Sequence, residues 1–374
     1  MKAYVFPGQG AQFVGMGKEL FKEYPEYVKK ADAILGYSIE ELCTVDSNGQ
    51  LDMTQYTQPA LFVVSALSYL DYVEKNGKPD LVAGHSLGEY NALFAAGAFS
   101  FETGVQFVKK RGELMGNANG GAMAAIVGMD EKQVRQVITK YHLDEVDISN
   151  LNTPKQTVIA STKEGIERAK VIFEGENVRR YVPLKVSAAF HSRYMKEAQE
   201  QFASYLEPFS FSELEIPVIS NYKALPYGKS EVKENLVKQL GSTVRWVESV
   251  WTMEAMGCTE IVEIGPGNVL TNMVKKIGRE TDSEVKKAYV SQINLEQKEG
   301  TNEEMSLPAD KDSAYDMVRE WNRVNPVGTE VLCNGYEQKL RTRTEAVVLF
   351  GHRAAVYMEG YNGYFDLREL RLAR

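Results

Sequence analysis

The stretch LVAGHSLGEYNALFAAGAF (residues 81–99) places a serine between two glycines where a short apolar run gives way to a helical one. Residues 81–83 are typical of a buried strand, and the segment from Gly88 onward favours a helix. The pattern G-x-S-x-G in this setting predicts a sharp turn that holds the hydroxyl of Ser86 clear of a sheet. Backbone N–H groups at the start of the helix would then face developing negative charge. An ordinary glycine-flanked turn with an idle serine is the alternative.

The first hundred residues alternate between strand-like and helical runs. Residues 3–6 favour a strand, residues 7–12 form a glycine-containing loop, and residues 16–35 favour a helix. Residues 59–77 are typical of a long apolar helix that ends at a glycine. This alternation predicts an α/β fold with a parallel sheet wrapped by helices.

The pattern changes near Gly120. Strand-like runs at 122–129, 146–161 (two strands and a turn) and 179–187 alternate with helical runs at 130–142 and 162–175. The order βαββαβ is that of a ferredoxin-like unit. Because the α/β pattern resumes at 216–221 and 258–270, we expect a ferredoxin-like subdomain at 122–189, inserted in a core formed by residues 1–121 and 190–293.

A third kind of sequence begins at Asn294. Residues 294–312 are acidic and polar, which is typical of a linker. Residues 314–325 suit one helix, and two later β-rich runs each contain an Asn-Gly pair, the usual signal of a hairpin turn. We therefore expect an acidic linker at 294–312 and a small β-rich C-terminal domain at 313–374.

Charge and cysteine content exclude several functions. The 43 basic and 51 acidic residues give a net charge of −8, which favours neither nucleic-acid nor anionic-membrane binding. The three cysteines form no C-x-x-C pair, so we expect neither a disulfide framework nor a zinc site. Apolar runs are too short for a secretory signal or a membrane span, which predicts a cytoplasmic protein.

A serine nucleophile needs a base, usually histidine, and the chain has four. His85 adjoins Ser86 on the turn and is expected to point away as a structural residue. His142 ends a polar helix, and His352 lies in the C-terminal region. His191 remains, at the junction between insert and core, where a cleft is expected. A purely structural histidine is the alternative for this position.

Arg111 shares one predicted helix face with Val108 and Met115, while Lys109 and Lys110 turn away. A guanidinium on a buried face requires an anion or several carbonyl acceptors. A structural ion pair and a bidentate grip on a substrate carboxylate both satisfy this requirement.

The segment FPGQGAQFVG (residues 6–15) follows the first strand. It is not G-x-G-x-x-G and lacks the Lys-Ser/Thr of a phosphate loop. We expect a backbone N–H of Gly8, Gln9 or Gly10 to serve as a second oxyanion donor. A tight turn that only packs is the alternative.

Taken together, these segments resemble the malonyl-CoA:acyl-carrier-protein acyltransferase family. The matching text runs in order from about residue 3 to residue 293: FPGQGAQ, TQPALF, GHSLGEY, VKKRGELM, GGAMAAIVG, NLNTPKQTVIAS, AAFHSRYM, IPVISN, VRWVESV and EIGPGNVL. The family fold is a hydrolase-like α/β core with an inserted ferredoxin-like subdomain. Details of GHSLGEYNALFAAGAF and SAAFHSRYM are most similar to the discrete, trans-acting acyltransferases of bacterial polyketide synthases, and the Phe190-His191 pair resembles their malonyl-selecting form.

By position, the resemblance implies roles for six residues: the nucleophile Ser86, its base His191, the oxyanion donors Gln9 and Leu87, the malonyl-carboxylate ligand Arg111, and Asn152 in the active-site neighbourhood. The family has no triad acid. Instead, a backbone carbonyl near Arg245 is expected to orient the histidine. The resemblance says nothing about residues 294–374.

The implied activity is that of a malonyl-CoA:ACP S-malonyltransferase, with malonyl-CoA and an acyl carrier protein as partners. Transfer passes through a serine ester and needs no metal or organic cofactor. Fatty-acid and polyketide (antibiotic) biosynthesis both fit. The alternatives are an acyl hydrolase that clears carrier proteins, a docking protein for a synthase complex, and a generic esterase. Arg111 argues against the hydrolase, and the intact Ser86 and His191 argue against a scaffold without activity.

Overall fold

The computed structural model describes residues 1–118, 120–176, 178–228, 230–303, 318, 321–333, 339–349, 353–359, 364–367 and 370–372. The chain divides into two compact units, residues 1–293 and 294–374. Across the described residues, no helix combines the length and the apolar character that crossing a membrane requires.

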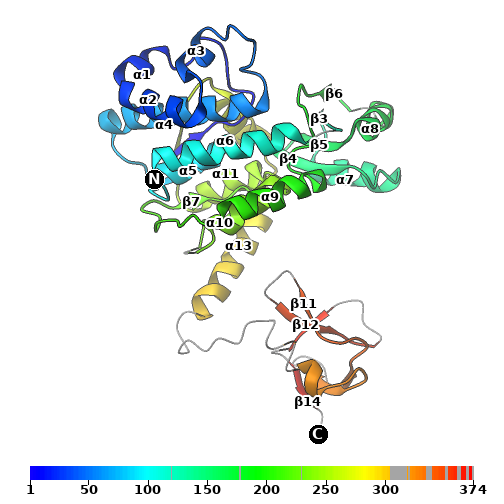
Figure 1. Ribbon diagram of the computed structural model, residues 1–374. Coiled ribbons are helices and arrows are strands. Elements are labelled where there is room, and N and C mark those ends of the chain that lie inside the picture. Colours follow the sequence, from blue (N-terminus) through cyan, green and yellow to red (C-terminus); the bar gives the residue numbers. More distant parts are fainter. Residues whose placement is uncertain are drawn as a thin grey trace. The chain divides into compact units, whose positions relative to one another are not determined.

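A parallel sheet lies at the centre of the first unit (Figure 1). Its strands are β1 (Lys2–Phe6), β2 (Leu81–Gly84), β7 (Val218–Ile219) and β8 (Glu260–Glu263), in the order β7-β2-β1-β8. Every neighbouring pair is parallel, with Val5 of β1 opposite Ala83 of β2 and Glu263 of β8. The predicted α/β fold with a parallel sheet and helices is confirmed.

Helices cover both faces of this sheet. Tyr4 and Phe6 of β1 face the cluster formed with α4 (Thr54–Asn76), α5 (Gly88–Ala95) and α6 (Phe101–Asn117). The alternate residues Ala3 and Val5 face α11 (Trp246–Ala255) and α12 (Val269–Glu280). Burial on both faces explains why β1 is apolar throughout rather than alternating.

The helical stretch expected at 16–35 is confirmed and consists of two helices, α1 (Lys18–Glu23) and α2 (Pro25–Leu35). Tyr24 leaves the helical conformation, because a residue before proline is pushed out of it. The short helix α3 (Ile39–Thr44) follows. Helix α4 begins five residues before the predicted start and accommodates Pro59 in its second turn.

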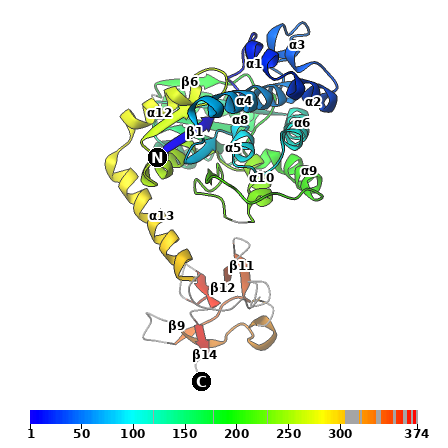
Figure 2. The same ribbon diagram turned by 90° about the vertical axis from the view of Figure 1, so that its left-hand side faces the viewer.

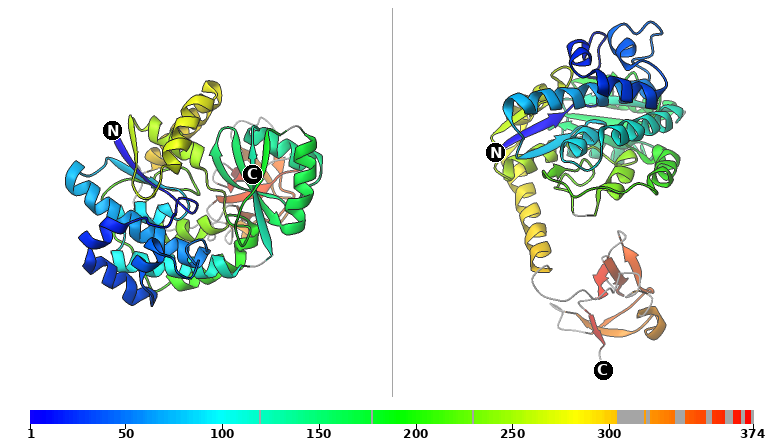
Figure 3. Two further views of the ribbon diagram at one scale, coloured as in Figure 1. Left: turned by 90° about the horizontal axis from the view of Figure 1, so that it is seen from above. Right: turned by 60° about the vertical axis from the view of Figure 1, so that its left-hand side comes forward.

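The segment between residues 121 and 183 contains an antiparallel sheet. Its strands are β3 (Gly121–Val127), β4 (Asp147–Thr153), β5 (Gln156–Thr162) and β6 (Arg180–Pro183), in the order β4-β5-β3-β6. Helices α7 (Glu131–Lys140) and α8 (Lys163–Gly175) share an apolar cluster with the sheet. Figure 3 shows this layer, in green, beside the parallel sheet.

The chain then returns to the core through a 3₁₀ turn (Arg193–Met195), α9 (Lys196–Leu206) and α10 (Val232–Leu240). Helix α13 (Ser283–Glu303) follows α12, and both are yellow in Figure 2. Residues 294–303 of the expected linker are therefore helical, which suits their glutamates, their one glutamine and their one lysine. Residues 304–312 lie outside the described residues.

The described residues of the second unit form two three-stranded antiparallel sheets, β10-β9-β14 and β11-β12-β13. The strands are β9 (Glu330–Cys333), β10 (Leu340–Arg341), β11 (Val347–Leu349), β12 (Arg353–Tyr357), β13 (Tyr364–Asp366) and β14 (Leu370–Leu372). Strands pair on both sides of each expected hairpin, but the Asn-Gly turns themselves, half of the expected helix 314–325 and His352 lie outside the described residues.

Candidate active site

Ser86 occupies the sharp turn between β2 and α5 that the sequence predicts. Its φ is +53°, a value that non-glycine residues seldom adopt. The flanking glycines are required by close packing: a Cβ at Gly84 would lie 1.9 Å from the carbonyl carbon of Gly88, and one at Gly88 would lie 2.0 Å from the Phe6 carbonyl oxygen. The turn therefore packs directly against β1 and leaves the serine at the carboxyl end of the strand.

His191 lies against this serine. Its Nε2 is 2.7 Å from the Ser86 Oγ, and its Nδ1 is 2.8 Å from the carbonyl oxygen of Gln239. Because a carbonyl only accepts, Nδ1 carries the proton and Nε2 is free to receive one from the serine. A main-chain carbonyl orients the histidine, as expected, but it belongs to Gln239 in the last turn of α10, where carbonyls lack helical partners, and not to a residue adjoining Arg245.

The base is held neutral. Burial, followed by the nearby Arg111 cation, lowers the pKa of His191 to about 3. Both effects disfavour the imidazolium, so the ring stays in its proton-accepting form at ordinary pH.

The guanidinium of Arg111 is buried and points into the same site. It donates to the side-chain oxygens of Gln58 (2.7 Å) and Gln239 (2.9 Å) and to the Ser86 Oγ (3.1 Å). Its Nε is buried without a hydrogen-bond partner. Within the part of the chain that the structure describes, no carboxylate forms an ion pair with Arg111 within 4 Å, so the structural ion pair is not the arrangement found. The cation is held by neutral acceptors.

Gln9, Leu87 and Asn152 line one cavity of about 160 Å³ together with Ser86, His191 and Arg111. All six residues singled out by the sequence therefore meet at one place. The side chain of Gln9 donates to Thr54 (3.3 Å), and the Oδ1 of Asn152 pairs with the ring of His85 (2.8 Å). His85 thus takes a structural partner, as expected, although it also lines the cavity.

Comparison with known proteins gives the family. Residues 3–310 match the family model described as "Acyl transferase domain". The chain belongs to the acyl transferase domain family.

Two curated relatives and one solved structure illustrate the similarity. The acyl transferase is 52% identical over 284 residues to "Polyketide biosynthesis protein PksE" of Bacillus subtilis (strain 168), covering 75% of this chain and 37% of that protein. It is 50% identical over 285 residues to "Polyketide biosynthesis malonyl CoA-acyl carrier protein transacylase PksC" of the same strain, covering 76% and 99%. The crystal structure of malonyl CoA-acyl carrier protein transacylase from Burkholderia pseudomallei matches with 46% identity and a TM-score of 0.73, covering 76% and 99%.

Sequence patterns missed Gln58, which accepts from Arg111, and two residues that bond the turn at Ser86. The side chain of Asn221 accepts from the Ser86 N–H and donates to the Gly84 carbonyl, both at 2.6 Å. The Nε2 of Gln239 donates to the Ser86 carbonyl at 2.9 Å. The N–H and the carbonyl of Ser86 are thus both hydrogen-bonded by side chains. Asn221 carried a signal, a polar residue ending the strand-like run IPVISN, whereas nothing in the sequence marked Gln239.

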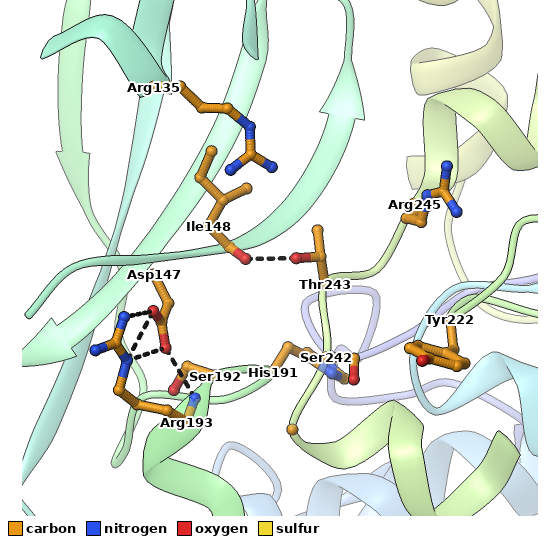
Figure 4. A pocket seen from close by; sticks show the side chains of 11 residues that line it. Arg135, Asp147, Ile148, His191, Ser192, Arg193, Tyr222, Ser242, Thr243 and Arg245 are labelled. Carbon is orange, nitrogen blue, oxygen red and sulfur yellow. Dashed lines mark hydrogen bonds and ion pairs between the residues drawn. The ribbon is translucent and has the colours of Figure 1, made fainter. Parts of the chain in front are cut away.

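A larger cavity, of about 550 Å³, adjoins the other side of His191 (Figure 4). Ion-paired Arg193 and Asp147 border it on one side, and the Thr243 hydroxyl donates to the Ile148 carbonyl across it. Beside it, the backbone of Val244 pairs with β4, donating to the Ser149 carbonyl (2.8 Å) and accepting from the Leu151 N–H (2.9 Å). The segment after α10 is thereby joined to the antiparallel sheet.

Proposed function

We propose that this acyl transferase moves a malonyl group from malonyl-CoA, through an ester on Ser86, to the phosphopantetheine thiol of an acyl carrier protein in polyketide synthesis. The observation that carries the proposal is the buried Arg111 cation, which lies 3.1 Å from the Ser86 Oγ and has no carboxylate partner among the residues that the structure describes. A malonyl group on that oxygen brings its own carboxylate into reach of the guanidinium. The names of the two transacylases reported above state that they act on malonyl-CoA and acyl carrier protein.

The proposed reaction has two matched halves. The Nε2 of His191 accepts the proton of Ser86 while the oxygen attacks the thioester carbonyl, and the same proton then goes to the departing CoA sulfur. Backbone N–H groups of Gln9 and Leu87 stabilise the tetrahedral oxyanion, each by about 3 kcal/mol. The carrier thiol then gives its proton to His191 and attacks the malonyl-serine ester, which returns the proton to Ser86.

We also propose that residues 122–189 form a ferredoxin-like subdomain within a core of residues 1–121 and 190–293. The element order β3-α7-β4-β5-α8-β6 and the strand order β4-β5-β3-β6 support this assignment. Residues 313–374 are proposed to form a small β-rich domain without a catalytic role, since every residue of the site lies before residue 293. The cytoplasmic location stays a prediction.

The substitution Arg111→Ala tests the proposed function. Malonyl loading should fall by about 10- to 150-fold, because a charge-assisted contact worth about 1.5–3 kcal/mol is lost. Acetyl-CoA has no carboxylate to hold, so its use should be largely spared. Single-turnover acylation of Ser86 with each thioester measures both rates.

Equal losses with malonyl-CoA and acetyl-CoA would assign Arg111 to the support of the fold and withdraw the malonyl assignment. Addition of a holo carrier protein to the malonyl-enzyme separates transferase from hydrolase: a transferase discharges the malonyl group onto the carrier thiol. Release as free malonate at the same rate with and without carrier would favour the hydrolase.

The low pKa of His191 predicts a flat pH profile for acylation. Because the folded pKa lies at about 3, the neutral ring persists as pH falls from 7 to 5. We expect the single-turnover rate with acetyl-CoA to change by less than about two-fold over that range, whereas a histidine of ordinary pKa would cost about thirty-fold at pH 5. Acetyl-CoA is chosen because it has no carboxylate of its own to titrate. A rate that halves near pH 6.5 would contradict the neutral resting state.

A chain that ends at Glu303 should still acylate Ser86 at the rate of the full chain, since the site lies within the first unit. The end point keeps α13 whole. Circular dichroism first establishes that the shortened chain folds, and single-turnover acylation then gives the rate. Loss of acylation in the folded, shortened chain would refute the separation of roles.

A further inference from the structure

Glu89 is a buried carboxylate that the reaction described above does not use. It stands in the first turn of α5, three residues after Ser86, and its exposed fraction is 0%. Within the described ranges it forms no ion pair within 4 Å. A buried carboxylate without a directly paired cation is costly unless its oxygens accept several hydrogen bonds.

Three groups donate to this carboxylate. Its Oε1 accepts from the Tyr227 hydroxyl and, at 3.1 Å, from the Asn221 N–H. Its Oε2 accepts from the Nε2 of Gln239 at 2.5 Å. An ionised carboxylate can only accept, so Gln239 must turn its NH₂ group toward Glu89. The Gln239 carbonyl oxygen then faces Arg111, 2.9 Å from its Nη2.

We propose that Glu89 is a positioning residue for malonyl selection: by fixing the orientation of the Gln239 amide, it directs the Arg111 guanidinium at the carboxylate of the acyl group. The inference rests on the proposed function. Arg111 is held by two neutral carbonyl acceptors, Gln58 and Gln239, and only the second can be reversed by a change at Glu89. A reversed amide would place its NH₂ against the guanidinium, donor against donor, and displace the cation.

The charge of Glu89 acts in the opposite direction. A negative group behind Gln239 repels a bound carboxylate, so its removal by itself would favour malonyl over acetyl groups. Positioning and charge balance therefore predict opposite changes in the ratio of malonyl to acetyl acylation. The direction in which the malonyl-to-acetyl ratio changes therefore distinguishes a positioning role of Glu89 from a charge-balancing role.

Glu89→Gln is the test, because it removes the charge and keeps the shape. Two donors, Tyr227 and Asn221, compete for the carbonyl oxygen of the new amide, whereas only one faces its other end. The new NH₂ therefore faces the Gln239 NH₂, donor against donor. The Gln239 amide must then reverse or shift, against the Ser86 carbonyl and the Arg111 guanidinium that hold its present orientation, and either change moves the carbonyl that Arg111 uses. We expect the malonyl-to-acetyl ratio of single-turnover acylation to fall about ten-fold or more at pH 8. Burial raises the pKa of Glu89 to about 7, so the wild-type carboxylate is ionised under these conditions.

Each outcome decides the matter. A lower ratio supports positioning; a higher ratio shows that Glu89 only balances charge, and an unchanged ratio shows that it only supports the fold. Glu231→Gln is the matched control: the same substitution at a carboxylate that accepts from Lys223 and Gly228 should leave the ratio unchanged.

Gln239→Met guards against a Glu89→Gln variant that does not fold. It removes the amide but keeps the main-chain carbonyl that His191 uses. The malonyl-to-acetyl ratio should fall in this variant too. An unchanged ratio would show that the Gln239 amide does not position Arg111. Failure of the proposed function is separate, because wild-type protein would then take no malonyl group on Ser86 at all.

Discussion

Ser86→Ala is expected to abolish the malonyl-enzyme. Mixed with malonyl-CoA, the wild-type protein should gain one malonyl group, and the variant should gain none. The reason is structural: the turn presents one hydroxyl to the base, with its Oγ 2.7 Å from the His191 Nε2. Intact-protein mass spectrometry with peptide mapping measures the adduct and its position.

Ser68→Ala is a matched control, because that hydroxyl donates to the Val64 carbonyl within α4. It should load malonyl like the wild type. Labelling that survives in Ser86→Ala would reject Ser86 as the nucleophile and, with it, the ester intermediate.

His191→Ala should slow acylation of Ser86 by about 10²- to 10⁴-fold, the usual contribution of a positioned base. Without the imidazole, the serine proton has no acceptor at 2.7 Å, and the Arg111 guanidinium that remains only donates and cannot accept that proton. Rapid-quench measurement of the malonyl-enzyme gives the rate of the chemical step.

His142→Asn provides the comparison, since His142 is an exposed histidine outside the cavity and tolerates the same positive φ that asparagine does. Its acylation rate should match the wild type. An undiminished rate in His191→Ala would place the base elsewhere, with His85 as the next group to test.

Local sequence patterns sufficed where one short segment determines the geometry. The glycines around Ser86 and the spacing that put Arg111 on a buried helix face needed no distant partner to be interpreted. His191 was found by elimination among four histidines. These three define most of the site.

The rest depends on contacts between segments far apart in the chain. The carbonyl that orients His191 belongs to Gln239, 48 residues away, and any residue type would supply it. A main-chain group leaves no trace in composition or spacing. The buried Glu89 looked like an ordinary polar residue in a helix. The break at Tyr24, by contrast, has a local signal in the sequence, because Pro25 follows it.

The backbone bonds between Val244 and β4 bear on how substrates enter. Two-lobed enzymes can open by a hinge movement about a flexible connecting segment. Here the segment after α10 is bonded to the antiparallel sheet by two backbone hydrogen bonds. A hinge movement would break these two bonds and carry Asn152 of β4 away from the segment that holds Gln239. Because the two sheets are joined at this point, we expect the choice of acyl group to depend on the side chains that line the cavity around Ser86.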